Sequence, residues 1–137
     1  MEAILLLANT AEDHVNKGMI NALGLGWSVT STPTPPISLV LFIQVPWDQT
    51  NIKHEVVIDL LDADGHPATV DASGSGIRIE GTFEAGRPAG STHGVPIDTA
   101  MIVNLGPGMR LTAGSGYQWR VQIDGVVATT RSFQVRG

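Results

Sequence analysis

The sequence contains no cysteine, and this absence excludes disulfide bonds, thiolate zinc sites and cysteine nucleophiles together. Charge is also scarce, because charged residues make up only 15% of the 137 positions. No apolar run approaches the roughly 20 residues that a membrane-spanning helix requires. Hydrophobic residues nevertheless make up 42% of the chain, which is enough to build a core and argues against intrinsic disorder. We therefore expect one domain over residues 1–137 that is stabilised by packing alone.

The few basic residues are isolated from one another, which bears on the class of partner. The sequence has 13 acidic and 8 basic residues, and its net charge is -5. This charge repels nucleic-acid phosphates and anionic lipid headgroups at long range. Since the basic residues form no cluster, we expect neither a nucleic-acid partner nor a membrane partner. The apolar run Ala3–Ala8 follows Glu2 and is too short for a signal-peptide core, so we expect a cytoplasmic protein or one assembled into a virion.

Turn-forming residues divide the chain into segments of strand length, because 16 glycines and 8 prolines are spread along it. The clearest strand is Tyr117–Ile123, in which apolar and polar residues alternate. The pair Asp124-Gly125 favours a type I′ turn, after which Val126–Val135 can return as the hairpin partner. The buried face of the first strand is predicted to consist of Tyr117, Trp119, Val121 and Ile123.

Two further segments indicate how the sheets are built. Ile37–Val45 is apolar on both faces except for Ser38 and Gln44, which predicts a central strand covered on both sides. His54–Leu61 also has the pattern of a strand and leads into a turn-forming sequence. Shorter strands are predicted at residues 3–8, 19–27, 67–70, 76–84 and 96–105, and residues 9–17 have room for one helical turn.

This pattern of roughly eight or nine short strands, with no convincing amphipathic helix, predicts an all-β fold. The most suitable architecture is a single two-sheet β-sandwich of mainly antiparallel strands. Immunoglobulin-like, jelly-roll and C2-like topologies all satisfy the pattern, and the sequence does not fix the strand order.

Three parts of the chain together resemble a known family. They are residues 8–12 leading into 23–28, residues 45–51 with His54 and residues 60–65, and residues 117–125. The middle part is the most specific and reads Val45-Pro46-Trp47-Asp48-Gln49-Thr50-Asn51. These parts resemble an uncharacterised family of small all-β proteins from actinobacteria and their phages, which has no assigned activity. The resemblance implies kinship and leaves the function open.

No arrangement of residues in the sequence is typical of a catalytic, cofactor or metal site. Asp62-Ala63-Asp64-Gly65 resembles the opening of a calcium loop, but Ser73 stands where an EF-hand has its glutamate. The histidines lack the close spacing of zinc ligands, and Gly114-Ser115-Gly116 lacks the Gly-x-Ser-x-Gly form of a nucleophile elbow. We therefore predict no catalytic residue, no cofactor and no bound metal, and we interpret the aspartates as turn residues.

One segment outside the predicted strands combines a large aromatic side chain with several hydrogen-bonding ones. Its candidate binding residues are Trp47, Asp48, Thr50, Asn51 and His54. One interpretation is a structural corner, in which the polar side chains cap a turn and Trp47 plugs the end of the sandwich. The other is a recognition edge, in which Trp47 anchors a partner and the polar residues set its orientation.

The sequence thus favours a non-enzymatic domain that binds a protein partner, or a second copy of itself, through a sheet edge or a loop cluster. Two alternatives stay open. One is a structural or accessory protein of a phage particle. The other is a small-ligand or sugar-binding module that uses Trp27, Trp47 or Trp119.

Overall fold

The chain forms ten β-strands and one short 3-10 helix in the part that the computed structural model describes, residues 1–13 and 19–137. The strands are β1 (Glu2–Ala8), β2 (Thr10–Asp13), β3 (Ile20–Leu23), β4 (Val29–Thr30), β5 (Ile37–Val45), β6 (His54–Asp62), β7 (Arg78–Phe83), β8 (Ile97–Leu105), β9 (Gly116–Ile123) and β10 (Val126–Val135). The 3-10 helix η1 (Trp47–Gln49) lies between β5 and β6. The all-β class predicted from the sequence is confirmed. Within the described residues, no helix has the length and apolar character needed to cross a membrane.

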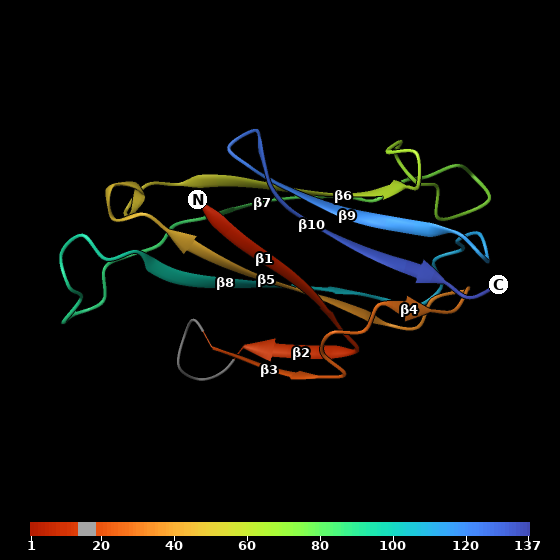
Figure 1. The fold of residues 1–137 in the computed structure, drawn as a ribbon, viewed down its shortest axis with the longest axis horizontal. Helices are drawn as coiled ribbons and strands as arrows, with labels where there is room; N and C mark the ends of the chain where they lie inside the picture. The colour runs from red at the N-terminus through yellow and green to blue at the C-terminus, as the bar shows by residue number, and fades with distance from the viewer. Residues whose placement is uncertain (14–18) are drawn as a thin grey trace.

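The strands are arranged in three layers, which Figure 1 shows nearly edge-on. A five-stranded sheet has the order β4-β10-β9-β6-β7, and its four longer strands form the upper layer, while the short β4 lies lower, below β10. A three-stranded sheet in the order β1-β5-β8 lies below the upper layer, and the β2-β3 ribbon forms the lowest layer. The pairing of β4 with β10 is parallel, and the other strand pairs are antiparallel.

The main core fills the space between the five-stranded and the three-stranded sheets. It contains buried side chains from both sheets, including Leu39 and Leu41 of β5 and Trp119 of β9. On β9, alternate residues are buried and the polar residues between them are half-buried, as a period of two residues requires. The predicted inward face is therefore confirmed, and its members are Tyr117, Trp119, Val121 and Ile123.

The hairpin that joins β9 to β10 has the predicted turn. Asp124 and Gly125 both have positive φ angles, 51° and 80° respectively. A type I′ turn requires this conformation at both central positions, and aspartate and glycine adopt it at low cost. The turn places the Asp124 side chain beside the start of β6, where it takes part in the site described below.

The prediction that Ile37–Val45 is covered on both sides is also confirmed. One face of β5 packs into the main core, and Val40 on the other face belongs to a second, smaller cluster with Ala8 and Ala11. Ala11 lies on β2, so the β2-β3 ribbon provides the cover for this outer face. The ribbon leaves the far end of the outer face open, and Ile4 there is 54% exposed.

Two local predictions were wrong, and a third is tested only in part. Residues 67–70 form no strand, because a single isolated bridge joins Pro67 to Leu61 and the Leu60 N–H donates to the Ile77 carbonyl oxygen, so the pairing does not continue. The strand expected at residues 19–27 is limited to β3, since Gly24 and Gly26 adopt positive φ angles of 65° and 92° and turn the chain. Of residues 9–17, where we expected room for one helical turn, Thr10–Asp13 form β2, and residues 14–17 lie outside the described residues.

Replacing Trp119 by alanine tests the core directly. Its side chain is 0% exposed, so Trp119→Ala should lower the free energy of unfolding by about 3 to 5 kcal/mol through lost burial and cavity formation. Denaturant unfolding measures this change. The control is Gln118→Ala on the opposite face of the same strand, which should cost less than about 1 kcal/mol. A comparably small loss for Trp119→Ala would show that β9 is inverted.

Candidate functional site

The segment around Trp47 folds into a closed corner between β5 and β6. Pro46 precedes η1, and the Thr50 hydroxyl donates a hydrogen bond of 2.7 Å to the carbonyl oxygen of Trp47. Thr50 is only 4% exposed. This bond fixes the end of the 3-10 turn and gives the buried hydroxyl hydrogen an acceptor.

Arg87, from the segment between β7 and β8, contacts this corner through two hydrogen bonds and a cation–π interaction. Its Nε donates to the Thr50 hydroxyl oxygen at 2.6 Å, and its Nη2 donates to the Trp47 carbonyl oxygen at 2.8 Å. The guanidinium carbon lies 3.9 Å from the centre of the Trp47 ring, in a cation–π arrangement. The ring of His93 also contacts Trp47, with 4.9 Å between centroids. Trp47 is thus engaged by side chains of its own chain.

The other two polar residues of the corner do not cap the turn with their side chains. Asn51 has a φ of 58°, a left-handed conformation that asparagine tolerates, and its backbone N–H donates to the Ala85 carbonyl oxygen at 2.8 Å. Asp48 is exposed, and its carboxylate makes no hydrogen bond to another described residue. Among the three polar residues of the structural-corner interpretation, Thr50 alone bonds the turn through its side chain.

His54 is buried at the base of the corner, and each of its ring nitrogens faces a hydrogen-bond acceptor. We call this arrangement the His54 clamp. His54 is 4% exposed, and its ring stacks on Phe83 with 5.3 Å between centroids. Nε2 lies 2.8 Å from the Gln49 carbonyl oxygen, and Nδ1 lies 2.6 Å from Oδ2 of Asp124. Both partners are acceptors, so both ring nitrogens can donate only when the imidazole is protonated. The Gln49 carbonyl first, and then Asp124, raise the pKa of His54 against the opposing effect of burial.

Asp124 completes this clamp from the β9–β10 turn. Its Oδ1 accepts the backbone N–H of Glu55 at 2.9 Å, while its Oδ2 faces His54. The Glu55 N–H, followed by the His54 bond, lowers the pKa of the Asp124 carboxyl group. A histidine oriented by an aspartate also occurs in hydrolase triads. Here the Gln49 carbonyl engages the second nitrogen, so the ring has no nitrogen free to take a proton from a nucleophile.

The turn after β6 gathers three side chains that are chemically able to bind a metal. Ligand atoms of Asp62, Asp64 and His66 lie within 4.8 Å of one another. Asp62 Oδ1, however, already accepts the backbone N–H groups of Asp64 at 2.9 Å and His66 at 3.0 Å. This confirms the interpretation that the aspartate bonds its own backbone two residues along the chain.

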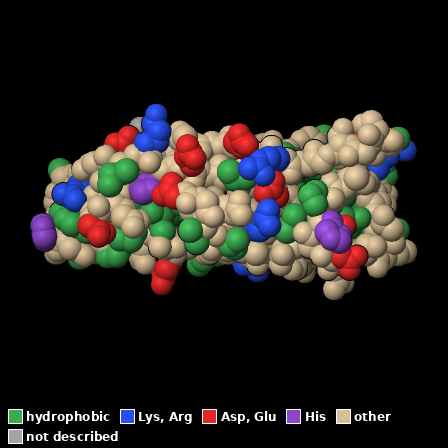
Figure 2. All heavy atoms as spheres, turned by 90° about the horizontal axis from the view of Figure 1, so that it is seen from above, with side chains coloured by type: hydrophobic (Ala, Val, Ile, Leu, Met, Phe, Trp, Pro, Cys, Tyr) green, Lys and Arg blue, Asp and Glu red, His purple; other side chains and the backbone are tan. Residues whose placement is uncertain are grey.

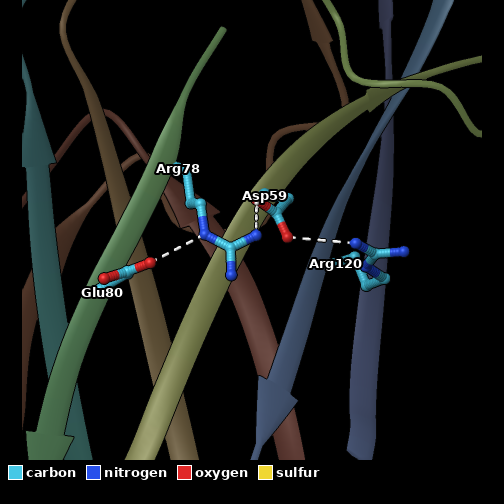
Figure 3. Close-up of polar contacts among 4 residues, drawn as sticks. All are labelled: Asp59, Arg78, Glu80 and Arg120. Atoms are coloured by element: carbon cyan, nitrogen blue, oxygen red, sulfur yellow. Dashed lines mark hydrogen bonds and ion pairs between the residues drawn. The ribbon is translucent and has the colours of Figure 1, made fainter. Parts of the chain in front are cut away.

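Sequence reasoning missed a charge network on the outer face of the five-stranded sheet (Figure 3). Asp59 of β6 accepts hydrogen bonds from Arg120 of β9 at 3.1 Å and from Arg78 of β7 at 3.4 Å, and Arg78 also donates to Glu80 at 2.9 Å. Figure 2 looks onto this face and shows acidic and basic side chains lying beside one another. These opposite charges compensate locally, so the network offers no strong single-sign field to a charged ligand.

The three-stranded sheet has two edges, and one of them is closed. At the β1 edge, the Leu5 carbonyl oxygen accepts Nε of Arg131 at 2.7 Å, and the Leu7 carbonyl oxygen accepts the N–H of Gly26 at 2.6 Å. These bonds link β1 to β10 and to the segment before β4. They satisfy the two β1 carbonyl groups, which would otherwise face an open side of the sheet.

The other edge of this sheet is β8, which has no backbone partner on its outer side among residues 1–13 and 19–137. The backbone groups of odd-numbered β1 residues point away from β5, so the odd-numbered residues of β5 bond to β8 instead. These β5 residues pair with odd-numbered β8 residues, so the outward N–H and C=O groups of β8 belong to its even-numbered residues. Those residues are Asp98, Ala100, Ile102 and Asn104. The sequence predicted this strand, at residues 96–105, but contained no signal of its edge position.

The tryptophans considered for ligand binding are not arranged as a binding surface. Trp119 is fully buried, which excludes it as a surface contact. Trp27 packs against the core with its ring 5.7 Å from that of Phe133, in an edge-to-face geometry. Trp47 lies under Arg87, as described above.

Comparison with known proteins identifies a family without supplying a function. The model of DUF6941, a family of unknown function, matches residues 3–136. No curated protein matches the sequence. Among solved structures, the alkylpurine DNA glycosylase AlkC of Pseudomonas fluorescens, bound to DNA containing an abasic site analog, is similar with a TM-score of 0.43 and 13% sequence identity. The match covers 80% of this chain and 28% of the glycosylase chain, so this chain spans less than a third of that protein.

The His54 clamp predicts a specific dependence of stability on pH. Because the folded state raises the pKa of His54, the clamp's contribution is complete below about pH 6.5 and is lost as the pH rises through the higher, folded pKa. The lowered pKa of Asp124 means that its contribution is lost on acidification below about pH 4.

Denaturant unfolding between about pH 6 and 8 measures the first effect. The free energy of unfolding should fall with rising pH in the wild type, and His54→Gln should flatten this slope. The exposed histidine variant His66→Gln serves as the matched control and should keep it. An equal slope in wild type and His54→Gln would contradict the assignment of a protonated clamp.

Proposed function

The chain belongs to DUF6941, a family of unknown function, and we propose that it is a non-enzymatic interaction domain that receives a strand of a protein partner along the open edge of β8. The single observation that carries this proposal is the edge itself, which is nine residues long and has no outer backbone partner in the described part of the chain. Extended segments add to such edges through main-chain hydrogen bonds, while alternate side chains provide specificity.

The β8 edge lacks the protection found at the other edges of the two larger sheets. Exposed edges are commonly blocked by shortness, charged side chains, proline or covering segments. β4 is two residues long, β7 carries Arg78 and Glu80, and the β1 edge is closed by Arg131. β8 has Asp98 as its one charged residue, and most of its other side chains are apolar and half-buried. This difference supports β8 as the interaction edge.

The non-enzymatic part of the proposal is supported by the His54 clamp. His54 and Asp124 have the geometry of a base and its orienting carboxylate, but a backbone carbonyl engages the nitrogen that a catalytic base would use. A protein partner is also better suited than a nucleic acid to a chain with a net charge of -5.

The Trp47 corner supports the β8 edge and is not itself the proposed recognition surface. Arg87 and His93, which contact the Trp47 ring, both lie in the segment that leads from β7 into β8. The backbone bond from Asn51 to Ala85 fixes the same segment near its start. We assign the corner the role of holding the approach to β8.

A lysine on the β8 edge tests the proposed function. Ala100→Lys places a charge where an added strand would pair, so it should abolish or strongly weaken capture of the partner. The measurement is affinity purification from the native host with wild type, Ala100→Lys and the control Val127→Lys. Val127 is 52% exposed on β10, so the control adds the same charge away from β8.

The partner should be recovered with wild type and with Val127→Lys, and not with Ala100→Lys. Melting temperatures of the three proteins show whether each is folded. Equal recovery of the partner with a folded Ala100→Lys protein would overturn the assignment of β8 as the interaction edge.

A further inference from the structure

We propose that the strand received by β8 is β8 of a second copy of this chain. This inference rests on the proposed function and names the partner of that same edge. The two three-stranded sheets, each ordered β1-β5-β8, would then join across a two-fold axis into one continuous antiparallel sheet. The contact is isologous, because each copy contributes the same strand to it.

The positions of the outward backbone groups select one register for this pairing. Only even-numbered residues of β8 present their N–H and C=O groups away from β5. The register that uses all of them pairs Asp98 with Asn104 of the second copy and Ala100 with Ile102 of the second copy. Met101 then faces its own equivalent across the two-fold axis. Small Ala100 opposite branched Ile102 gives a compatible pair on the outer face of the sheet.

A hydrogen bond within each copy orients the Asn104 side chain for this register. The Ser38 hydroxyl donates to Oδ1 of Asn104 at 2.6 Å, and Ser38 is 2% exposed. Since this bond occupies the amide oxygen, it orients the Asn104 amide and leaves the NH₂ group as a donor. Asp98 is exposed, and its carboxylate can only accept when ionised. The two ends of β8 are therefore complementary to each other in an antiparallel pair.

The same register avoids repulsion between the copies. Asp98 is the one charged residue on β8, and at this spacing it lies opposite an amide. A shift of the register that places Asp98 opposite Asp98 of the second copy would bring like charges together, which is unfavourable directly across a ladder. Charge and hydrogen-bonding capacity thus agree on the same alignment.

An exchange of the two end residues tests the proposal. Asn104→Asp keeps an acceptor for the Ser38 hydroxyl, so the fold should be retained, but it places two carboxylates opposite one another at both ends of the pair. The dimer dissociation constant should rise about tenfold or more. The double variant Asp98→Asn with Asn104→Asp has the wild-type net charge and should restore the wild-type constant. Sedimentation velocity over a dilution series measures the constants, with Ala100→Lys as the blocked edge and Val127→Lys as the control.

A wild-type dimer that Ala100→Lys and Asn104→Asp weaken, and that the exchanged double variant restores, supports the proposal. Two results overturn it. The first is a wild type that stays monomeric at every concentration. The proposed function is then still tested separately, by affinity purification of the partner with Ala100→Lys. The second is a dimer that the folded Ala100→Lys and Asn104→Asp variants leave unchanged, because such a dimer uses another surface.

Discussion

Backbone N–H and C=O groups need hydrogen-bond partners, and an open sheet leaves two rows of them at its edges. In the three-stranded sheet this requirement is met differently on the two sides. Arg131 and Gly26 supply donors to the carbonyl groups of β1, so that edge is joined to β10 and to the segment before β4. β8 has no equivalent donors in the described part of the chain. The asymmetry of these two edges is the feature from which the proposed interaction follows.

Local patterns predicted the core well because burial of a strand is visible in its own residues. The alternation in Tyr117–Ile123 and the two apolar faces of Ile37–Val45 both correspond to the observed burial. The β9–β10 turn was predictable from Asp124-Gly125, since few residue pairs accept two positive φ angles. The prediction failed at residues 67–70, where the Leu60 N–H bonds Ile77 and leaves a single bridge at Pro67. It also failed around Gly24 and Gly26, where the chain turns sooner than its apolar content indicated.

The interactions at the corner and at the edge depend on the fold as a whole and had no local signal. The sequence identified Trp47, Thr50 and His54, but Thr50 meets Arg87 across 37 positions and His54 meets Asp124 across 70. The edge position of β8 depends likewise on the order of the strands, and a single sequence does not contain that order in any one segment. The residue types therefore indicated where polar side chains cluster. Only the fold showed that these side chains form hydrogen bonds with other side chains of the same chain.

Hydrogen exchange at individual amides of β8 tests the account most directly. In dilute protein, the N–H groups of Ala100 and Ile102 should exchange quickly, while those of Thr99, Met101 and Val103, which face β5, should be protected. At high concentration, Ala100 and Ile102 should gain protection as the second copy covers the edge, and the other three should change little. Equal protection of both sets in dilute protein, or no gain at Ala100 and Ile102 on concentration, would contradict an open edge that pairs with its own copy.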